Sequence, residues 1–227
     1  MHPRVKQLLE MNYFEQRSNE WLSLREGMLT ASDVATALGA NPYETPERLI
    51  AKKVYKIKWA GNAATAHGTL LEPIARDMYD ARYNRKSHEI GLVQHPVHKW
   101  LGGSPDGITE DGLLIEIKCP LSRKIKSEVP GHYLPQIQLL LEILDLEECD
   151  FIQYRPSGEK PEEFNVVSVK RSREWFEKSL PVLKAFWDRV QSAKTTGLCE
   201  IQLERRFSPP DAQCEIELEL RNNVIVE

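Results

Sequence analysis

The sequence contains no apolar run long enough to span a bilayer, and its first residues, MHPRVKQLLEMNYF, lack the pattern of a signal peptide. Both absences predict a soluble, intracellular protein. Cysteine is scarce as well, with four residues that lie far apart and form no C-x-x-C pair: Cys119, Cys149, Cys199 and Cys214. This spacing argues against a zinc ribbon and, without a secretory signal, against a disulfide framework.

The chain also lacks an excess of positive charge, because 30 lysines and arginines face 34 aspartates and glutamates, which gives a formal net charge of −4. Total charge excludes little here, since a metal site requires its own acids and the distribution of charge matters more for nucleic-acid binding. Basic groups occur at residues 52–58, 82–86 and 123–126. We interpret the first two as solvated faces, whereas the third directly follows an apolar strand at 113–118.

A length of 227 residues, of which 41% are hydrophobic and 28% charged, fits one globular domain of generous size. Periodicity and capping residues predict helices at 3–11, 18–27, 31–38, 45–58, 64–83, 132–144 and 172–190. Apolar or alternating runs predict strands at 88–94, 100–103, 113–118, 149–155, 164–169, 201–207 and 214–220. Strands and helices in this order predict an α/β (α+β) fold with a mixed sheet that is flanked by helices.

The pattern divides the chain near residue 195. We expect residues 1–194 to form a single domain, and residues 1–60 to supply its N-terminal helices. Beyond that point, alternating and acid-rich strands are separated by S-P-P, so we expect residues 195–227 to form a strand-rich extension. Its role stays open between an added hairpin, an oligomer contact and a segment that pairs with another chain.

The stretch WLGGSPDGITEDGLLIEIKCP, residues 100–120, holds the most informative residues. Asp106 lies in a tight turn, and Glu116 and Lys118 lie two apart within an apolar strand, so they share one face of it. The intervening E-D-G sequence favours a hairpin, because Asp-Gly accommodates the positive φ angles of the common hairpin turns. Folding at that turn brings Asp106 beside Glu116.

Two carboxylates at the end of a hairpin form a hard-oxygen site suited to Mg²⁺ or Mn²⁺. A nearby ammonium from Lys118 could orient an attacking water or offset the charge that develops on a transferring phosphate. This combination is typical of metal-assisted phosphodiester hydrolysis. The alternative is a common turn beside a solvated ion pair. The apolar neighbours on both sides favour the metal site, because an uncompensated charge there is costly.

S-P-D-G, a hairpin and then I-E-I-K-C-P resemble the core of the PD-(D/E)XK nucleases, in particular the branch of lambda exonuclease and the viral alkaline exonucleases. The resemblance extends from about residue 21 to residue 141, with five motifs in the family's order. It implies the PD-(D/E)XK fold, a central mixed sheet flanked by helices. It also implies that Asp106, Glu116 and the backbone carbonyl of Ile117 hold one or two Mg²⁺ ions, for which Mn²⁺ can substitute.

The segment W-L-S-L-R-E-G-M-L-T-A-S resembles the family stretch in which an arginine and a serine bind the 5′-phosphate of a DNA end. Those positions are Arg25 and Ser32, so residues 1–60 are expected to contribute to DNA-end binding. Independently, an arginine fork suits a terminal phosphate, and a hydroxyl near a helix N-terminus adds a donor. On the residues alone, Arg25 could equally pair with Glu20 or Glu26, and Ser32 could be a helix cap.

Three further site residues follow from the resemblance. Glu72, in a G-x-x-x-E-P helix motif, would support a metal-bound water, although it could equally pair with Arg76 four residues on. Ser104 matches a family serine close to the scissile phosphate. Gln136, in the Y-x-x-Q-x-Q element, would position the attacking water together with Lys118.

The resemblance therefore implies a Mg²⁺-dependent exonuclease that degrades one strand of linear double-stranded DNA from its 5′ end, in viral or phage DNA recombination, repair or replication. Its expected partners are DNA ends and a single-strand annealing protein, and relatives form ring trimers, so a homo-oligomer is a further expectation. Two alternatives stay open: a structure-dependent endonuclease on the same core, and a non-catalytic nucleic-acid-binding module.

Overall fold

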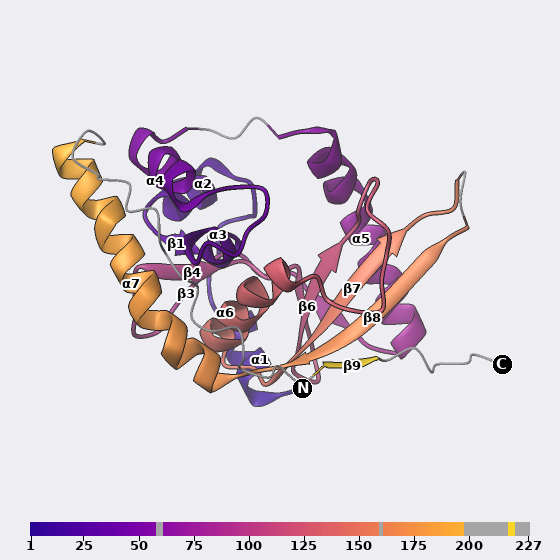
Figure 1. The fold of residues 1–227 in the computed structure, drawn as a ribbon. Helices are drawn as coiled ribbons and strands as arrows, with labels where there is room; N and C mark the ends of the chain where they lie inside the picture. The colour runs from indigo at the N-terminus through magenta and orange to yellow at the C-terminus, as the bar shows by residue number, and fades with distance from the viewer. Residues whose placement is uncertain (58–60, 159–160, 198–217, 221–227) are drawn as a thin grey trace.

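The computed structural model describes residues 1–57, 61–158, 161–197 and 218–220 (Figure 1). Its helices are α1 (Pro3–Leu9), α2 (Asn19–Glu26), α3 (Val34–Ala37), α4 (Pro46–Tyr55), α5 (Ala63–Tyr83), α6 (Leu134–Leu144) and α7 (Arg173–Thr196), with short 3₁₀ helices at Ala31–Asp33 and Gly131–Tyr133. Its strands are β1 (Leu29–Thr30), β2 (Ser87–His88), β3 (Val93–Gln94), β4 (Leu101–Gly103), β5 (Gly107–Thr109), β6 (Leu113–Lys118), β7 (Glu148–Arg155), β8 (Glu163–Lys170) and β9 (Leu218–Leu220).

A six-stranded mixed sheet with the order β2-β5-β6-β7-β8-β9 forms the centre of the fold, as the sequence predicts. Strands β6 and β7 are parallel, and the other neighbouring strands are antiparallel. Alternate side chains of β6 point to opposite faces, where Leu114 packs with α6 and Ile115 packs with Leu71 of α5. Figure 1 shows α5 and α6 flanking this strand.

A second, three-stranded sheet has the order β1-β4-β3. Strand β1 runs parallel to β4, with Leu29 opposite Leu101 and Thr30 opposite Gly102, while β3 is antiparallel to β4. Because of this pairing, the segments that follow β1 and β4 leave the small sheet side by side and in the same direction. The first continues into Ala31–Asp33, and the second continues directly into the hairpin β5–β6.

The predicted continuous strand at 88–94 is wrong. Strand β2 joins β5 in the large sheet, whereas β3 joins β4 in the small one. The chain crosses between the sheets through Gly91, where a Cβ atom would lie 2.6 Å from the carbonyl oxygen of Phe14 and from Cβ of Tyr13. This close backbone approach accommodates only glycine.

The predicted helix at 45–58 ends earlier than expected. Thr45 caps α4, and the helix stops at Tyr55 because Lys56 adopts a left-handed conformation with φ of 51°. Lys52 and Lys53 are thus on the helix and Lys56 is its cap, while residues 58–60 lie outside the described part of the chain. Ser18 and Ser172, the first residues of the predicted helices at 18–27 and 172–190, cap α2 and α7, and each accepts a backbone N–H from the first turn of its helix.

The boundary expected at residue 194 falls inside α7, which extends to Thr196 and lies along one edge of the molecule beside α4 (Figure 1). Of the expected extension, the structure describes residues 195–197 and β9, which pairs antiparallel with β8 at the edge of the large sheet. The predicted strand at 201–207 lies outside the described residues. Among the described helices, none is both long and apolar enough to cross a bilayer.

Candidate active site

The hairpin β5–β6 brings the predicted acidic residues together. Gly107 lies opposite Ile115, and the connecting turn contains Gly112 with φ of 102°. Asp106 immediately precedes β5, and its Oδ2 accepts a hydrogen bond of 2.7 Å from the backbone N–H of Ile117. The Nζ atom of Lys118 lies 3.9 Å from the same oxygen. The spacing of these residues in the sequence therefore becomes a compact cluster of charge at the end of the hairpin.

Glu116 is fully buried and only partly satisfied by its partners. Its Oε1 accepts hydrogen bonds from Nζ of Lys118 and, over 2.6 Å, from Nε2 of Gln136 at the start of α6. Its Oε2 is buried without a hydrogen-bond partner in the described structure. Because an unsatisfied buried carboxylate oxygen is costly, this atom fits a further positively charged ligand.

The electrostatics of the site favour a cation for the same reason. Burial and the neighbouring carboxylates of Asp106 and Glu72 raise the pKa of Glu116 to about 8. Burial and Asp106 raise the pKa of Glu72 to about 7. Burial lowers the pKa of Lys118, but Glu116 and Asp106 outweigh it and raise this pKa above its usual range. Lys118 is therefore a permanent ammonium at neutral pH, which can donate hydrogen bonds but cannot act as a base.

The donor set fits magnesium or manganese rather than zinc. In the described part of the chain, no three His, Cys, Asp or Glu side chains are grouped to hold an ion. Magnesium, however, uses only one or two carboxylates and fills its other positions with carbonyl oxygens, water and substrate. Asp106 and Glu116 offer two carboxylates of this kind side by side, and Oε2 of Glu116 is buried without a hydrogen-bond partner in the described structure.

Glu72 faces this cluster from α5 and is paired with two arginines. Its Oε2 lies 3.5 Å from Nη2 of Arg17, and its Oε1 lies 3.5 Å from Nη2 of Arg76. The i,i+4 pair with Arg76 that the sequence allows is thus present. Even with this ion pair, Glu72 lines the same pocket as Asp106.

Arg25 and Ser32 meet beside the hairpin. Nη2 of Arg25, in the last turn of α2, donates to Oγ of Ser32 over 3.0 Å and to Oγ1 of Thr30 over 3.4 Å. The alternative that the sequence left open, an ion pair of Arg25 with Glu20 or Glu26, is not among the ion pairs of the described residues, and Glu26 pairs with Lys56. Burial lowers the pKa of Arg25, and Asp33 opposes that shift.

Trp21 connects this pair of residues to the hairpin. Its indole Nε1 donates to Oγ of Ser104 over 3.0 Å, two residues before Asp106. The guanidinium of Arg25 lies over the face of the same ring, 4.3 Å from its centroid. One rigid side chain therefore sets the distance between the Arg25–Ser32 pair and the acidic cluster.

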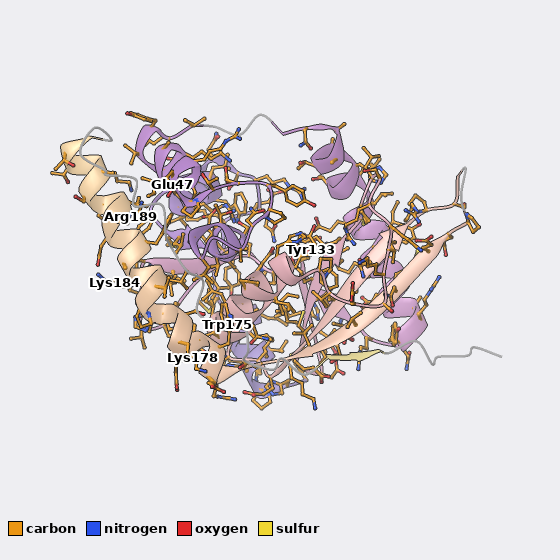
Figure 2. All side chains as sticks on the ribbon, viewed as in Figure 1. Glu47, Tyr133, Trp175, Lys178, Lys184 and Arg189 are labelled. Atoms are coloured by element: carbon orange, nitrogen blue, oxygen red, sulfur yellow. The ribbon has the colours of Figure 1, made fainter. Side chains whose placement is uncertain are left out.

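The predicted residues from both halves of the site line a single pocket. Its walls are formed by Gln16, Arg17, Trp21, Arg25, Ala31, Ser32, Glu72, Ser104, Asp106 and Gln136. Glu116 lies directly behind this wall, where it contacts Gln136 and Lys118. The Nζ atom of Lys118 also lies 5.3 Å from the ring centroid of Tyr133. Figure 2 shows Tyr133 near the middle of the molecule, far from Lys178 and Lys184 on α7.

Sequence reasoning missed Gln16 and Arg17, and assigned no role to Trp21. Trp21 belongs to the recognised W…T-A-S segment, so the motif itself carries a signal for it. Gln16 and Arg17 precede that segment in a stretch without helical or strand periodicity. No pattern in the sequence places them in the pocket.

The family model described as a YqaJ-like viral recombinase domain matches residues 20–147 of this chain. An uncharacterised protein of Acanthamoeba polyphaga mimivirus is 32% identical over 169 residues, which cover 66% of this chain and 31% of the relative. A protein of African swine fever virus, strain Badajoz 1971 Vero-adapted, is 32% identical over 156 residues, which cover 55% of this chain and 45% of the relative. The chain thus spans between about a third and a half of the length of these relatives.

Solved structures share the fold. An alkaline exonuclease from Laribacter hongkongensis, LHK-Exo, is 27% identical with a TM-score of 0.65, and the match covers 78% of this chain and 95% of that one. The same exonuclease has also been solved in complex with dAMP, with a TM-score of 0.65. A phage-related exonuclease from Haemophilus somnus 129PT is 15% identical with a TM-score of 0.55, covering 73% of this chain and 95% of that one, and shows a similar fold.

Proposed function

We propose that this chain, which belongs to the YqaJ-like viral recombinase family, is a divalent-metal-dependent exonuclease that degrades one strand of linear duplex DNA from its 5′ end. The family and the alkaline exonuclease neighbours support a nuclease role. The observation that carries the proposal is the hairpin that holds Asp106, Glu116 and Lys118 together behind the pocket. The family description further supports a role in DNA recombination.

Asp106, Glu116 and the carbonyl of Ile117 would hold Mg²⁺, or Mn²⁺ in its place. When bound, the metal polarises a phosphate oxygen and makes water a better nucleophile. The protein's own contribution is positional and electrostatic. Lys118, a permanent ammonium, donates to Glu116 and stabilises negative charge on the phosphate. Gln136 is anchored on Glu116 and lines the pocket, so its amide is placed to hold water or a phosphate oxygen.

The 5′ polarity rests on the Arg25–Ser32 pair. An arginine guanidinium and a hydroxyl, 3.0 Å apart in the pocket wall, offer several donors to one phosphate group. A terminal phosphate carries more negative charge than an internal phosphodiester, so this pair should prefer a phosphorylated end. Ser104, held by Trp21, adds a hydroxyl between that end and Asp106, where it can contact the next phosphate.

The test compares three substrates in Mg²⁺: a linear duplex with a 5′-phosphate, the same duplex with a 5′-hydroxyl, and a covalently closed circle. We expect fast release of nucleotides from the first, slow release from the second, and an intact circle. Glu116→Gln should abolish the product, because it removes a negative ligand while it keeps the shape of the side chain.

Each other outcome has a definite meaning. Equal rates on the two linear substrates would refute the assignment of Arg25 and Ser32 to the end phosphate. Cutting of the circle would establish an endonuclease on the same core. Tight DNA binding without product in Mg²⁺ or Mn²⁺ would establish a non-catalytic binding module and overturn the proposed activity.

A further inference from the structure

Arg17 lines the pocket as a basic residue that has no role in the proposed reaction. It precedes α2, and its side chain is 58% exposed while its guanidinium reaches Glu72 at 3.5 Å. Its backbone is left-handed, with φ of 71°, which is uncommon for a residue other than glycine, asparagine or aspartate. A long charged side chain therefore stands at a turn position whose backbone favours a small residue.

Both neighbours of Arg17 fix this turn firmly. Nε2 of Gln16 donates to the backbone carbonyl of Ile90 over 2.9 Å and to that of Pro105, the residue before Asp106, over 3.2 Å. On the other side, Ser18 caps α2 by accepting the backbone N–H of Trp21. The base of Arg17 is therefore held against the segment that carries the acidic cluster, while its guanidinium end is partly in solvent.

The ion pair between Arg17 and Glu72 is the more exposed of the two that Glu72 makes. Arg76 is only 12% exposed and contacts Glu89 as well, so it is held in place from two sides. Arg17 reaches Glu72 from solvent at 3.5 Å, and an ion pair of this kind contributes little because water screens it. Glu72 would keep Arg76 as a partner if Arg17 moved away.

We propose that Arg17 is a second phosphate-binding residue of the pocket, which exchanges Glu72 for an internal phosphate of the DNA strand whose terminal phosphate lies against Arg25 and Ser32. The inference rests on the proposed function, because it assumes that a DNA strand enters the pocket. A guanidinium forms a short, charge-assisted and often bidentate contact with a phosphate, which outweighs a screened pair at 3.5 Å. Arg25 would then bind the terminal phosphate and Arg17 an internal phosphate of the same strand.

The experiment measures equilibrium binding of fluorescent linear duplexes with a 5′-phosphate or a 5′-hydroxyl, in EDTA so that no strand is cut, across a range of KCl concentrations. Arg17→Gln should weaken binding of both duplexes by the same factor, about tenfold. It should also lower the slope of log affinity against log salt by about 0.7 to 0.9, the loss of one phosphate contact. Arg25→Gln should weaken mainly the phosphorylated duplex.

Two variants separate this role from a structural one. Arg17→Lys keeps the positive charge, so it should keep the wild-type salt slope. Lysine and glutamine are equally strained by the left-handed backbone at this position, so a difference between the two variants reports the charge. Arg173→Gln is the matched control. Arg173, the first residue of α7, is 59% exposed and does not line the pocket. Among the described residues its ion-pair partner is Glu147, so its loss should change neither affinity nor slope.

The outcomes distinguish this inference from the proposed function. Wild-type affinity and slope in Arg17→Gln would overturn the inference alone. An effect of Arg17→Gln confined to the phosphorylated duplex would overturn it too, because Arg17 would then share the terminal phosphate with Arg25. A wild-type protein that binds neither duplex would overturn the proposed function and this inference with it.

Discussion

The side-chain amide of Gln136 donates to Oε1 of Glu116 over 2.6 Å and joins α6 to β6 behind the pocket wall. Together with Lys118, it occupies one oxygen of the carboxylate and leaves Oε2 without a partner in the described structure. The orientation of Glu116 is therefore set by protein contacts before any ligand arrives. Such preorganisation reduces the rearrangement that a bound ion would require.

Gln136→Ala should lower the turnover number by about ten- to a hundredfold, because Glu116 loses a fixed donor and the pocket loses an amide that can hold water. The Michaelis constant for a phosphorylated duplex should change little, since Arg25 and Ser32 are untouched. Steady-state kinetics on a labelled duplex separates the two quantities. A change confined to the Michaelis constant would contradict the assigned role.

Gln138→Ala is the matched control on the same helix. The amide of Gln138 donates to the carbonyl of Lys170 and accepts the backbone N–H of Ser172, so its role is structural. Its loss should lower the free energy of unfolding by about 1–3 kcal/mol, because buried backbone groups lose partners. The turnover number should stay at the wild-type value.

Metal affinity should rise with pH. The pKa values of Glu72 and Glu116, about 7 and about 8, lie above their usual range, so both carboxyl groups are largely protonated in slightly acidic solution. Because a metal binds the ionised form of Glu116, and its positive charge favours ionisation of the neighbouring Glu72, metal binding must displace these protons. The dissociation constant for Mn²⁺ should fall from pH 6 to about pH 8 and then level off. Calorimetric titration in buffers of different ionisation heat measures both affinity and released protons, and a flat profile would contradict the prediction.

The stability of the metal-free protein should change with pH in the opposite direction. The folded state binds a proton at Glu116 up to a pKa of about 8, whereas the unfolded chain releases it near 4.5. The folded state therefore binds more protons between these values, and the free energy of unfolding falls as the pH rises through them. Glu116→Gln should remove up to about 1.4 kcal/mol per pH unit of this slope. Denaturant unfolding in EDTA at pH 6, 7 and 8 tests it, and parallel curves for the two proteins would refute it.

Lys53 should support the Arg25–Ser32 pair from behind. Its Nζ is 2.7 Å from Oδ2 of Asp33, and Asp33 in turn accepts the hydroxyl of Thr30 over 2.7 Å. Lys53→Met leaves a largely buried carboxylate without its lysine, which should cost about 3 kcal/mol of unfolding free energy. It should also reduce the preference for a 5′-phosphorylated duplex, because Thr30 contacts Ser32. Thermal unfolding and the ratio of the two exonuclease rates measure these effects.

Lys52→Met provides the comparison for Lys53. The two lysines are neighbours on α4, but the side chain of Lys52 is 30% exposed, against 12% for Lys53, and its partner Glu44 would keep a second cation, Arg48, at 4.0 Å. Its loss should cost only about 0–1 kcal/mol and should leave the end preference unchanged. Equal effects of both substitutions would mean that the charge of α4, and not the contact with Asp33, supports the pocket.

Much of the fold could be predicted because its signals are local. The strand alternation of β6 places Glu116 and Lys118 on one face, and the D-G turn sets the hairpin. The caps at Ser18 and Ser172 are equally local. The split of 88–94 between two sheets was not predictable, because it depends on the approach of residues 13 and 14 to Gly91. Contacts between distant parts of a chain leave no periodic trace in its sequence.

The candidate site divides in the same way. The cluster of Asp106, Glu116 and Lys118 follows from spacing and a turn. The residues themselves left Arg25 undecided between a phosphate and a glutamate, and only the resemblance pointed to the phosphate. Arg17 gave no signal at all, because its place in the pocket depends on the anchoring of Gln16 to residues 90 and 105. The placement is tertiary, and the chemistry of an arginine does not reveal it.

The pairing of β1 with β4 fixes the relative position of the two chain segments that carry Ser32 and Ser104. Thr30 lies opposite Gly102; Ser32 follows Thr30 by two residues, in the 3₁₀ helix Ala31–Asp33, and Ser104 follows Gly102 by two residues. Under the proposed function, the main-chain hydrogen bonds between β1 and β4 therefore fix the distance between the residues that bind the DNA end and the residues that catalyse hydrolysis. The length of each released fragment is then a property of the backbone, and a single-residue insertion after β4 should change that length while the metal ligands stay intact.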